Sequence, residues 1–238
     1  MRSLFTLLFI FSVLTISAQN KKVIYCLPGQ GADSRQFEHL QVDTSVYEVQ
    51  ILEYDIEFEG QTMAELAYDL SKEINDDRPF ILLGVSLGGM LCMEINAIKQ
   101  AEKIILISSA AGREELPGRY TIQRHTPLYQ RIPESAYVWG ASFLQPLVEP
   151  DSKNVSALCH SMLSDKDPSY MKRSVEMILE WDRSVDDTPV IHLHGNKDHT
   201  LPARKIPHIN YLIDGGSHMM ILTRTDEINR ILQEVLVD

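Results

Sequence analysis

Six short stretches of the chain are rich in apolar and β-branched residues, and segments with helical or turn-like patterns separate them. The stretch "VIYCL" (23–27) ends at the breaker cluster "PGQG", which is typical of a buried strand followed by a loop. The other candidate strands are 47–52, 80–85, 103–108, 189–195 and 208–214. Several of them are apolar at consecutive positions, as expected for parallel strands covered by helices on both faces.

Helical periodicity lies between the strands. In "QTMAELAYDLSKEI" (61–74), apolar side chains recur at the three- and four-residue spacing of one helix face. Strands that alternate with helices need crossover connections, and these pair the strands in parallel. We therefore predict an α/β fold with a mainly parallel sheet of about six strands and helices on both faces.

The stretch 112–184 departs from this alternation. It contains helical patches but no convincing strand, together with prolines and large aromatic side chains. These residues are Pro117, Pro127, Pro133, Pro146, Pro150, Pro168, Tyr137, Trp139, Phe143 and Trp181. A structureless loop of this length is uncommon in a compact domain, so we predict a helical cap inserted between two strands.

The N-terminus has the pattern of a secretory signal. Arg2 precedes an almost uninterrupted apolar run, 4–16, and small and polar residues follow it. A membrane span needs about 20 apolar residues, so this run is short for one. We predict a signal peptide over 1–18, with cleavage after Ala18, and a secreted or periplasmic protein. An uncleaved membrane anchor and an element of the fold are the alternatives.

Composition favours one domain over residues 19–238. The 238 residues are 44% hydrophobic and 23% charged, as in an ordinary globular chain. The formal net charge is −11 with no basic run, which argues against binding to nucleic acid or to an anionic membrane surface. We expect a small-molecule partner. The three cysteines are too few for a disulfide framework, and Cys26 and Cys92 are interpreted as small buried hydrophobes.

The strongest chemical motif is Gly-x-Ser-x-Gly at 84–88, between a candidate strand and a candidate helix. A strand that turns sharply into a helix holds the intervening residue in a strained conformation, and Gly84 and Gly88 remove side chains that would collide there. The turn lifts the hydroxyl of Ser86 above the carboxyl edge of the sheet, close to a helix N-terminus that favours negative charge. Close backbone packing alone is the alternative explanation of this motif.

A serine nucleophile needs a base and a group that orients the base. His218 lies in a glycine-rich loop just past the last candidate strand, and Asp198 lies just past the strand before it. The competing histidines are His39, His125, His160, His192, His194, His199 and His208, and the competing acids are Asp186, Asp187 and Asp214. His192 and His194 share one strand face at a spacing that metals can use, but no cluster completes a site, so we assign them a structural role and expect neither metal nor cofactor.

Taken together, "LPGQGAD", "GVSLGG", "HGNKD" and "GGSH" resemble the motifs of the α/β-hydrolase superfamily, in the same order and over the whole mature chain. The resemblance implies Ser86 as nucleophile, Asp198 as orienting acid and His218 as general base. It also implies an oxyanion hole from the amides of Leu87 and Gln30. Many members have His-Gly where this chain has Pro-Gly, so Gly31 remains an alternative to Gln30.

The chain departs from the family pattern at the N-terminus, where the usual leading antiparallel hairpin has no room between the predicted signal and Val23, so we expect a reduced sheet of about six strands. With the predicted signal, the leading functional hypothesis is an exported serine hydrolase that cleaves a carboxylic ester through an acyl-enzyme on Ser86. A thioesterase or acyltransferase and a catalytically silent binding protein are the alternatives. Three cap methionines, Met162, Met171 and Met177, either line an acyl pocket or pack the cap on the body.

Overall fold

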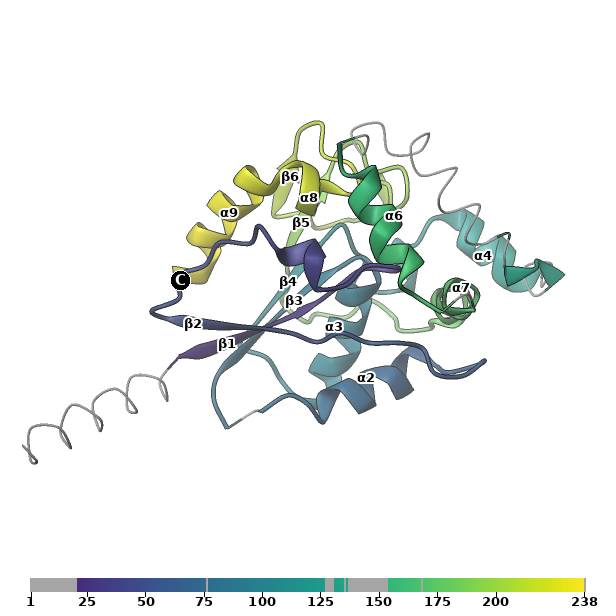
Figure 1. Ribbon diagram of the computed structural model, residues 1–238, viewed down its shortest axis with the longest axis horizontal. Coiled ribbons are helices and arrows are strands. Elements are labelled where there is room, and N and C mark those ends of the chain that lie inside the picture. The colour runs from purple at the N-terminus through teal and green to yellow at the C-terminus, as the bar shows by residue number, and fades with distance from the viewer. Residues whose placement is uncertain are drawn as a thin grey trace, which may run out of the picture.

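The computed structural model describes residues 21–75, 77–126, 131–134, 136, 154–167 and 169–237 (Figure 1). Its centre is a six-stranded sheet in the order β2-β1-β3-β4-β5-β6, and every pairing is parallel. The strands are β1 (Lys22–Leu27), β2 (Tyr47–Ile51), β3 (Phe80–Val85), β4 (Lys103–Ile107), β5 (Ile191–Gly195) and β6 (Tyr211–Ile213). The predicted α/β class and the reduced six-stranded sheet are confirmed.

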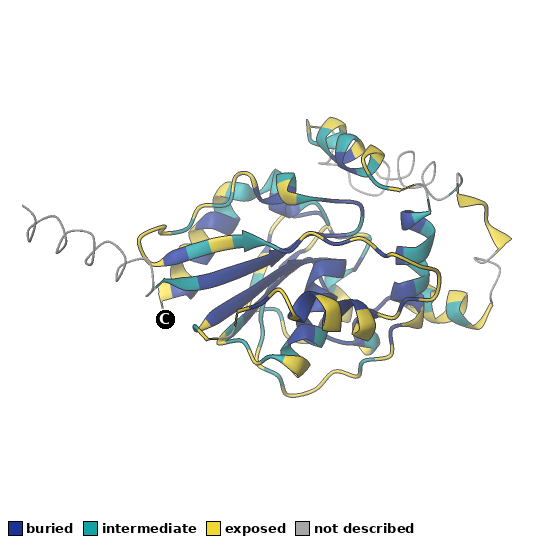
Figure 2. Cartoon of the chain, turned by 60° about the horizontal axis from the view of Figure 1, so that its bottom comes forward, coloured by how far each residue is buried: buried dark blue, intermediate teal, exposed yellow. Residues whose placement is uncertain are grey.

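Both faces of the sheet are buried, so alternate side chains of one strand enter two different apolar cores. In β1, Val23, Tyr25 and Leu27 join one apolar core, whereas Ile24 and Cys26 join the core on the opposite face. Figure 2 shows the central strands buried along most of their length. All six residues of β3 are buried, which explains why its sequence is apolar throughout rather than alternating.

Helices cover both faces of the sheet. The first core is closed by α2 (Met63–Ser71), α3 (Leu87–Ile98) and α7 (Tyr170–Glu180). The second core is closed by the 3₁₀ turn η1 (Ser34–Phe37) and by α8 (Met220–Thr223) and α9 (Thr225–Val237). Figure 1 shows α2 and α3 on one side of the sheet and α8 and α9 on the other.

Helix α2 begins at a capping box. Thr62 accepts from the amide of Glu65, and Glu65 bonds back to the Thr62 amide, so two backbone donors of the first turn are satisfied. The helix ends at Ser71, three residues before the end of the periodic segment.

Between β4 and β5, the described part of the chain contains helices and no strand. They are the 3₁₀ turn η2 (Arg113–Glu115), α4 (Gly118–His125), α6 (Ser156–Ser164) and α7. Helix α7 belongs to the body, because Tyr170, Met177 and Ile178 are part of the first core. Helix α6 packs Cys159 and Met162 against Ala32 in the loop after β1.

Several residues of the sequence analysis lie outside the described residues. These are the predicted signal peptide and, from the inserted stretch, Pro127, Tyr137, Trp139, Phe143, Pro146, Pro150 and Pro168. Among the described residues, no helix is long and apolar enough to cross a membrane.

The order of the strands defines where a ligand can bind. From β1 the chain moves to β2 on one side, and from β3 it moves to β4 on the other side. At such a switch point the loops leaving neighbouring parallel strands open a crevice at the carboxyl edge of the sheet. The loops after β1 and β3 contain "PGQG" and Ser86, respectively.

Candidate active site

Ser86 occupies the turn between β3 and α3 in a backbone conformation that L-residues rarely adopt, with φ 52° and ψ −118°. The turn is possible because its flanking residues lack side chains. A Cβ on Gly84 would lie 2.5 Å from the carbonyl oxygen of Gly88, and a Cβ on Gly88 would lie 2.5 Å from that of Pro28. Ser109 supports the turn by donating its hydroxyl to the Ser86 carbonyl at 2.7 Å.

The structure brings Ser86, His218 and Asp198 into one hydrogen-bonded chain, hereafter the Ser–His–Asp chain. Nε2 of His218 lies 2.9 Å from Oγ of Ser86, and Nδ1 of the same ring lies 2.8 Å from Oδ2 of Asp198. The Asp198 side chain is fully buried, whereas His218 is 12% exposed. The serine hydroxyl thus faces a base whose second nitrogen is held by a carboxylate, which is the arrangement that activates a hydroxyl.

Two glycine-containing turns hold the acid and the base at this spacing. Asp198 follows β5 and His218 follows β6, and these strands are paired. The amide of Lys197 donates to the carbonyl of Gly216 at 2.9 Å, and the amide of Asn196 donates to the carbonyl of Ile213 at 3.1 Å. The turn carrying Asp198 is therefore bonded directly to the turn that leads into His218.

Asp198 is held as a carboxylate. Burial alone raises its pKa, but the charge of His218 and the hydrogen bonds from His194 and His218 outweigh burial, so the pKa lies below its ordinary value. Its other oxygen, Oδ1, accepts from the amide of Leu201 at 2.7 Å. Both carboxylate oxygens are thus engaged.

The loop after β1 distinguishes between the two candidate oxyanion donors. The amide of Gly29 donates to the side chain of Gln36 at 2.8 Å, and the amide of Gly31 points at the hydroxyl of Tyr170 at 3.5 Å. Within the part of the chain that the structure describes, the amides of Gln30 and Leu87 donate to no protein group. Gln30 is consequently the better candidate, because its amide remains available for a ligand.

The loop is also tied to its neighbours by side chains. Tyr54 donates its hydroxyl to the carbonyl of Pro28 at 2.7 Å, and the side-chain amide of Gln30 donates to the hydroxyl of Ser174 at 2.7 Å. Tyr54 and Tyr170 are both buried, and burial raises the pKa of both phenols. Their contribution had no sequence signal, since Tyr170 lies 139 positions from Gly31.

None of the competing residues takes the place of a member of the Ser–His–Asp chain. His199 is exposed, and Asp214 accepts from the side chain of Asn196 at 2.7 Å. Asp186 pairs with Arg183. His192 and His194 are buried and face each other, with 3.1 Å between Nε2 of His192 and Nδ1 of His194. Among the described residues, no group of three or more His, Cys, Asp or Glu is arranged to hold a metal ion.

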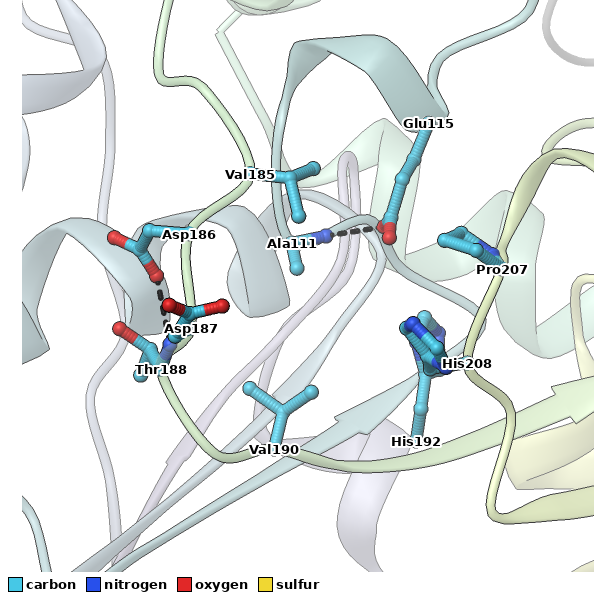
Figure 3. A pocket seen from close by; sticks show the side chains of 10 residues that line it. All are labelled: Ala111, Glu115, Val185, Asp186, Asp187, Thr188, Val190, His192, Pro207 and His208. Carbon is cyan, nitrogen blue, oxygen red and sulfur yellow. Dashed lines mark hydrogen bonds between the residues drawn. The ribbon is translucent and has the colours of Figure 1, made fainter.

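A cavity of about 550 Å³ lies beside β5 (Figure 3). Its wall includes Glu115, Asp187, His192 and His208, but no member of the Ser–His–Asp chain. Glu115 accepts from the amide of Ala111 at 2.7 Å, and burial raises the pKa of its carboxyl.

The parallel sheet, the serine on its strand-to-helix turn, and an acid and a histidine after later strands define an α/β hydrolase. The chain belongs to the alpha/beta hydrolase family, whose sequence pattern matches residues 9–231. It is therefore a hydrolase by fold and family. A comparison with curated proteins gave no match.

Solved structures share the fold at low sequence identity. A thermophilic esterase from Thermogutta terrifontis is 16% identical with a TM-score of 0.67, over 91% of this chain and 90% of that chain. The esterase EaEST from Exiguobacterium antarcticum is 18% identical with a TM-score of 0.66, over 90% and 91%. The enol-lactonase from Burkholderia xenovorans LB400 is 16% identical with a TM-score of 0.64, over 92% of each chain.

Proposed function

We propose that this hydrolase cleaves a carboxylic ester through an acyl-enzyme on Ser86, with His218 as general base and Asp198 as the acid that orients it. The observation that carries the proposal is the pair of hydrogen bonds of 2.9 and 2.8 Å that links the three side chains. A buried carboxylate on Nδ1 fixes the tautomer in which Nε2 is free to accept the serine proton.

The reaction proceeds in two halves. Oγ of Ser86 attacks the ester carbonyl while Nε2 of His218 takes its proton, and the carbonyl oxygen becomes an oxyanion. The amides of Gln30 and Leu87 donate to that oxygen, and each well-placed donor contributes about 3 kcal/mol. The intermediate collapses as His218 returns the proton to the leaving alcohol. Water, deprotonated by His218, then attacks the acyl group and releases the acid and Ser86.

Apolar side chains next to the oxyanion loop support an acyl substrate. A Cβ on Gly31 would lie 3.1 Å from Cδ1 of Leu163 and 3.5 Å from the sulfur of Met171. These two residues therefore lie beside the position where the acyl carbonyl is held. Met162 and Met177 are buried in packing clusters, and Met171 also belongs to the first core.

Several parts of the proposal concern the protein's surroundings. We infer export to a secreted or periplasmic location from the signal-like segment 1–18, and a small-molecule partner from the net charge of −11. Thioester hydrolysis or acyl transfer by the same three residues is the second candidate, which export disfavours because coenzyme A esters are less available there. A catalytically silent binding protein is the third.

The deciding experiment is a panel of p-nitrophenyl esters of increasing acyl length with the purified protein, next to Ser86→Ala and a fluorophosphonate probe. We expect hydrolysis and a covalent adduct on Ser86 with the wild type, and neither with Ser86→Ala. A folded wild type that forms no adduct contradicts the proposal and favours the silent binding protein. Hydrolysis that survives Ser86→Ala contradicts the assignment of the nucleophile.

A further inference from the structure

A second imidazole touches the carboxylate of the Ser–His–Asp chain. Nε2 of His194 lies 3.3 Å from Oδ2 of Asp198, and His218 bonds to the same oxygen at 2.8 Å. Oδ1 is already taken by the amide of Leu201. Two histidine rings therefore share one carboxylate oxygen, and His194 is the fully buried one of the two.

The partners of His194 settle which of its nitrogens carries a proton. Besides the carboxylate, Nε2 lies 2.7 Å from the carbonyl oxygen of Leu201. A carbonyl and an ionised carboxylate only accept hydrogen bonds, so Nε2 must be the N–H side of the ring. The ring donates this proton to the Leu201 carbonyl, and the same N–H side of the ring lies 3.3 Å from Oδ2 of Asp198.

The opposite side of the ring is compatible with this assignment. Nδ1 of His194 lies 3.1 Å from Nε2 of His192, and the two ring planes are inclined by 63°. Burial, followed by the proximity of His194, lowers the pKa of His192 to about 3, so His192 is neutral near pH 7. Either His192 donates to Nδ1 of a neutral His194, or His194 is protonated and donates from both nitrogens. Nε2–H faces Asp198 in both cases.

Other titratable and charged groups lie around His194 and Asp198, and they come from several elements. His192 and Glu115 line the cavity beside β5 together with His208 (Figure 3). Glu115, from η2, interacts electrostatically with His194. From α4, Tyr120 lies within the electrostatic reach of Asp198 and has Arg119 beside it. These groups share the environment of Asp198, but among the described residues only His194 and His218 bond to its carboxylate through side chains.

We propose that His194 is a positioning residue of the active site, which holds Asp198 in place and withdraws part of its negative charge from His218. A carboxylate that accepts a second hydrogen bond stabilises the imidazolium form of His218 less. His194 therefore lowers the proton affinity of His218, the general base. This inference rests on the proposed function, because it assigns His218 the role of base.

The first test is the pH profile of kcat/KM for p-nitrophenyl acetate. Replacing His194 by leucine removes the donor, and we expect the pKa of the acidic limb to rise by roughly half a unit to one unit. His194→Gln, which keeps a donor near the position of Nε2, restores the wild-type limb. His199→Gln is the matched control, since His199 is an exposed histidine next to Asp198. If the pKa of the acidic limb is unchanged in a folded His194→Leu variant, the proposal is overturned.

The second test needs no substitution, so it holds even where His194→Leu does not fold. In protein with ¹⁵N-labelled histidine, we expect NMR to show His194 with a protonated Nε2 and a slowly exchanging, downfield proton. A neutral His194 with its proton on Nδ1 overturns the proposal. Absence of ester hydrolysis by the wild type overturns the proposed function itself, whereas wild-type hydrolysis with an Nδ1–H His194 overturns only the role of His194.

Discussion

Gly195, the last residue of β5, lies directly against the backbone of Gly216, and a Cβ at position 195 would collide with the Gly216 carbonyl and lie 2.9 Å from its Cα. These two glycines belong to the turns that carry Asp198 and His218. Their contact therefore sets how closely the acid and the base approach each other.

We expect Gly195→Ala to damage both stability and activity. Forcing extra volume into a packed contact costs about 1–3 kcal/mol of the free energy of unfolding. The two turns must also move apart, so kcat should fall further than the loss of stability explains. Urea unfolding and kcat measured on the folded fraction check the prediction. Gly118→Ala is the matched control, because no atom lies within 4 Å of a Cβ at that position.

The Ser–His–Asp chain makes graded predictions. Ser86→Ala removes the nucleophile and should lower kcat by at least about three orders of magnitude. Asp198→Asn leaves the side-chain volume but favours the wrong tautomer of His218, and we expect a loss on the order of 10⁴-fold. Steady-state kinetics with a short p-nitrophenyl ester measure both. Asp187→Asn, on the wall of the cavity beside β5, should retain wild-type turnover.

The residues of the Ser–His–Asp chain could be predicted because each one follows the end of a strand. A strand that stops at a glycine-rich turn is readable in sequence, and parallel strands bring such ends to one edge, which places Ser86, Asp198 and His218 together. The role of His194 was not readable in this way. Its place in β5 fixes which face it occupies, but its distance to Asp198 depends on how the following turn folds back. Tyr170 was missed because packing of the inserted stretch, rather than local pattern, brings it to the loop after β1.

Strand ends were predicted less well than strand positions. The segment 208–214 contributes only Tyr211–Ile213 to the sheet. The amide of Asn210, just before it, donates instead to the carbonyl of His192 at 3.0 Å.

The ionisation of Asp198 links stability to pH. Its pKa in the folded protein lies below the value of about 3.9 expected in the unfolded chain. As the pH falls through that value, the unfolded chain takes up the proton first, so the stabilisation is present above about pH 4 and is lost at lower pH. We expect the difference in unfolding free energy between wild type and Asp198→Asn to shrink between about pH 4 and pH 2. Urea titrations across this range measure it, and a constant difference contradicts the depressed pKa.

Tyr54 is expected to act on the active site through the oxyanion loop. Tyr54→Phe deletes the hydrogen bond to the Pro28 carbonyl, and such a bond contributes about 1 kcal/mol to the free energy of unfolding. Because Gln30 follows two residues later, we also expect kcat to fall while KM changes little. Tyr68→Phe is the control, since Tyr68 is exposed on α2. Equal kinetics for the two variants would leave Tyr54 with a role in stability alone.

Leu163 and Met171 should set the preferred acyl length. Both side chains lie within van der Waals distance of a Cβ built at Gly31, beside the proposed oxyanion donors. Truncating Met171 to alanine opens space there, so we expect the optimum of the p-nitrophenyl ester series to move toward longer chains, and Leu163→Trp to move it toward acetate. The ratio of kcat/KM between long and short esters reports the shift. Ile122→Ala, on the exposed face of α4, is the control and should leave that ratio unchanged. If neither substitution changes the ratio, the acyl group lies on another side of Ser86.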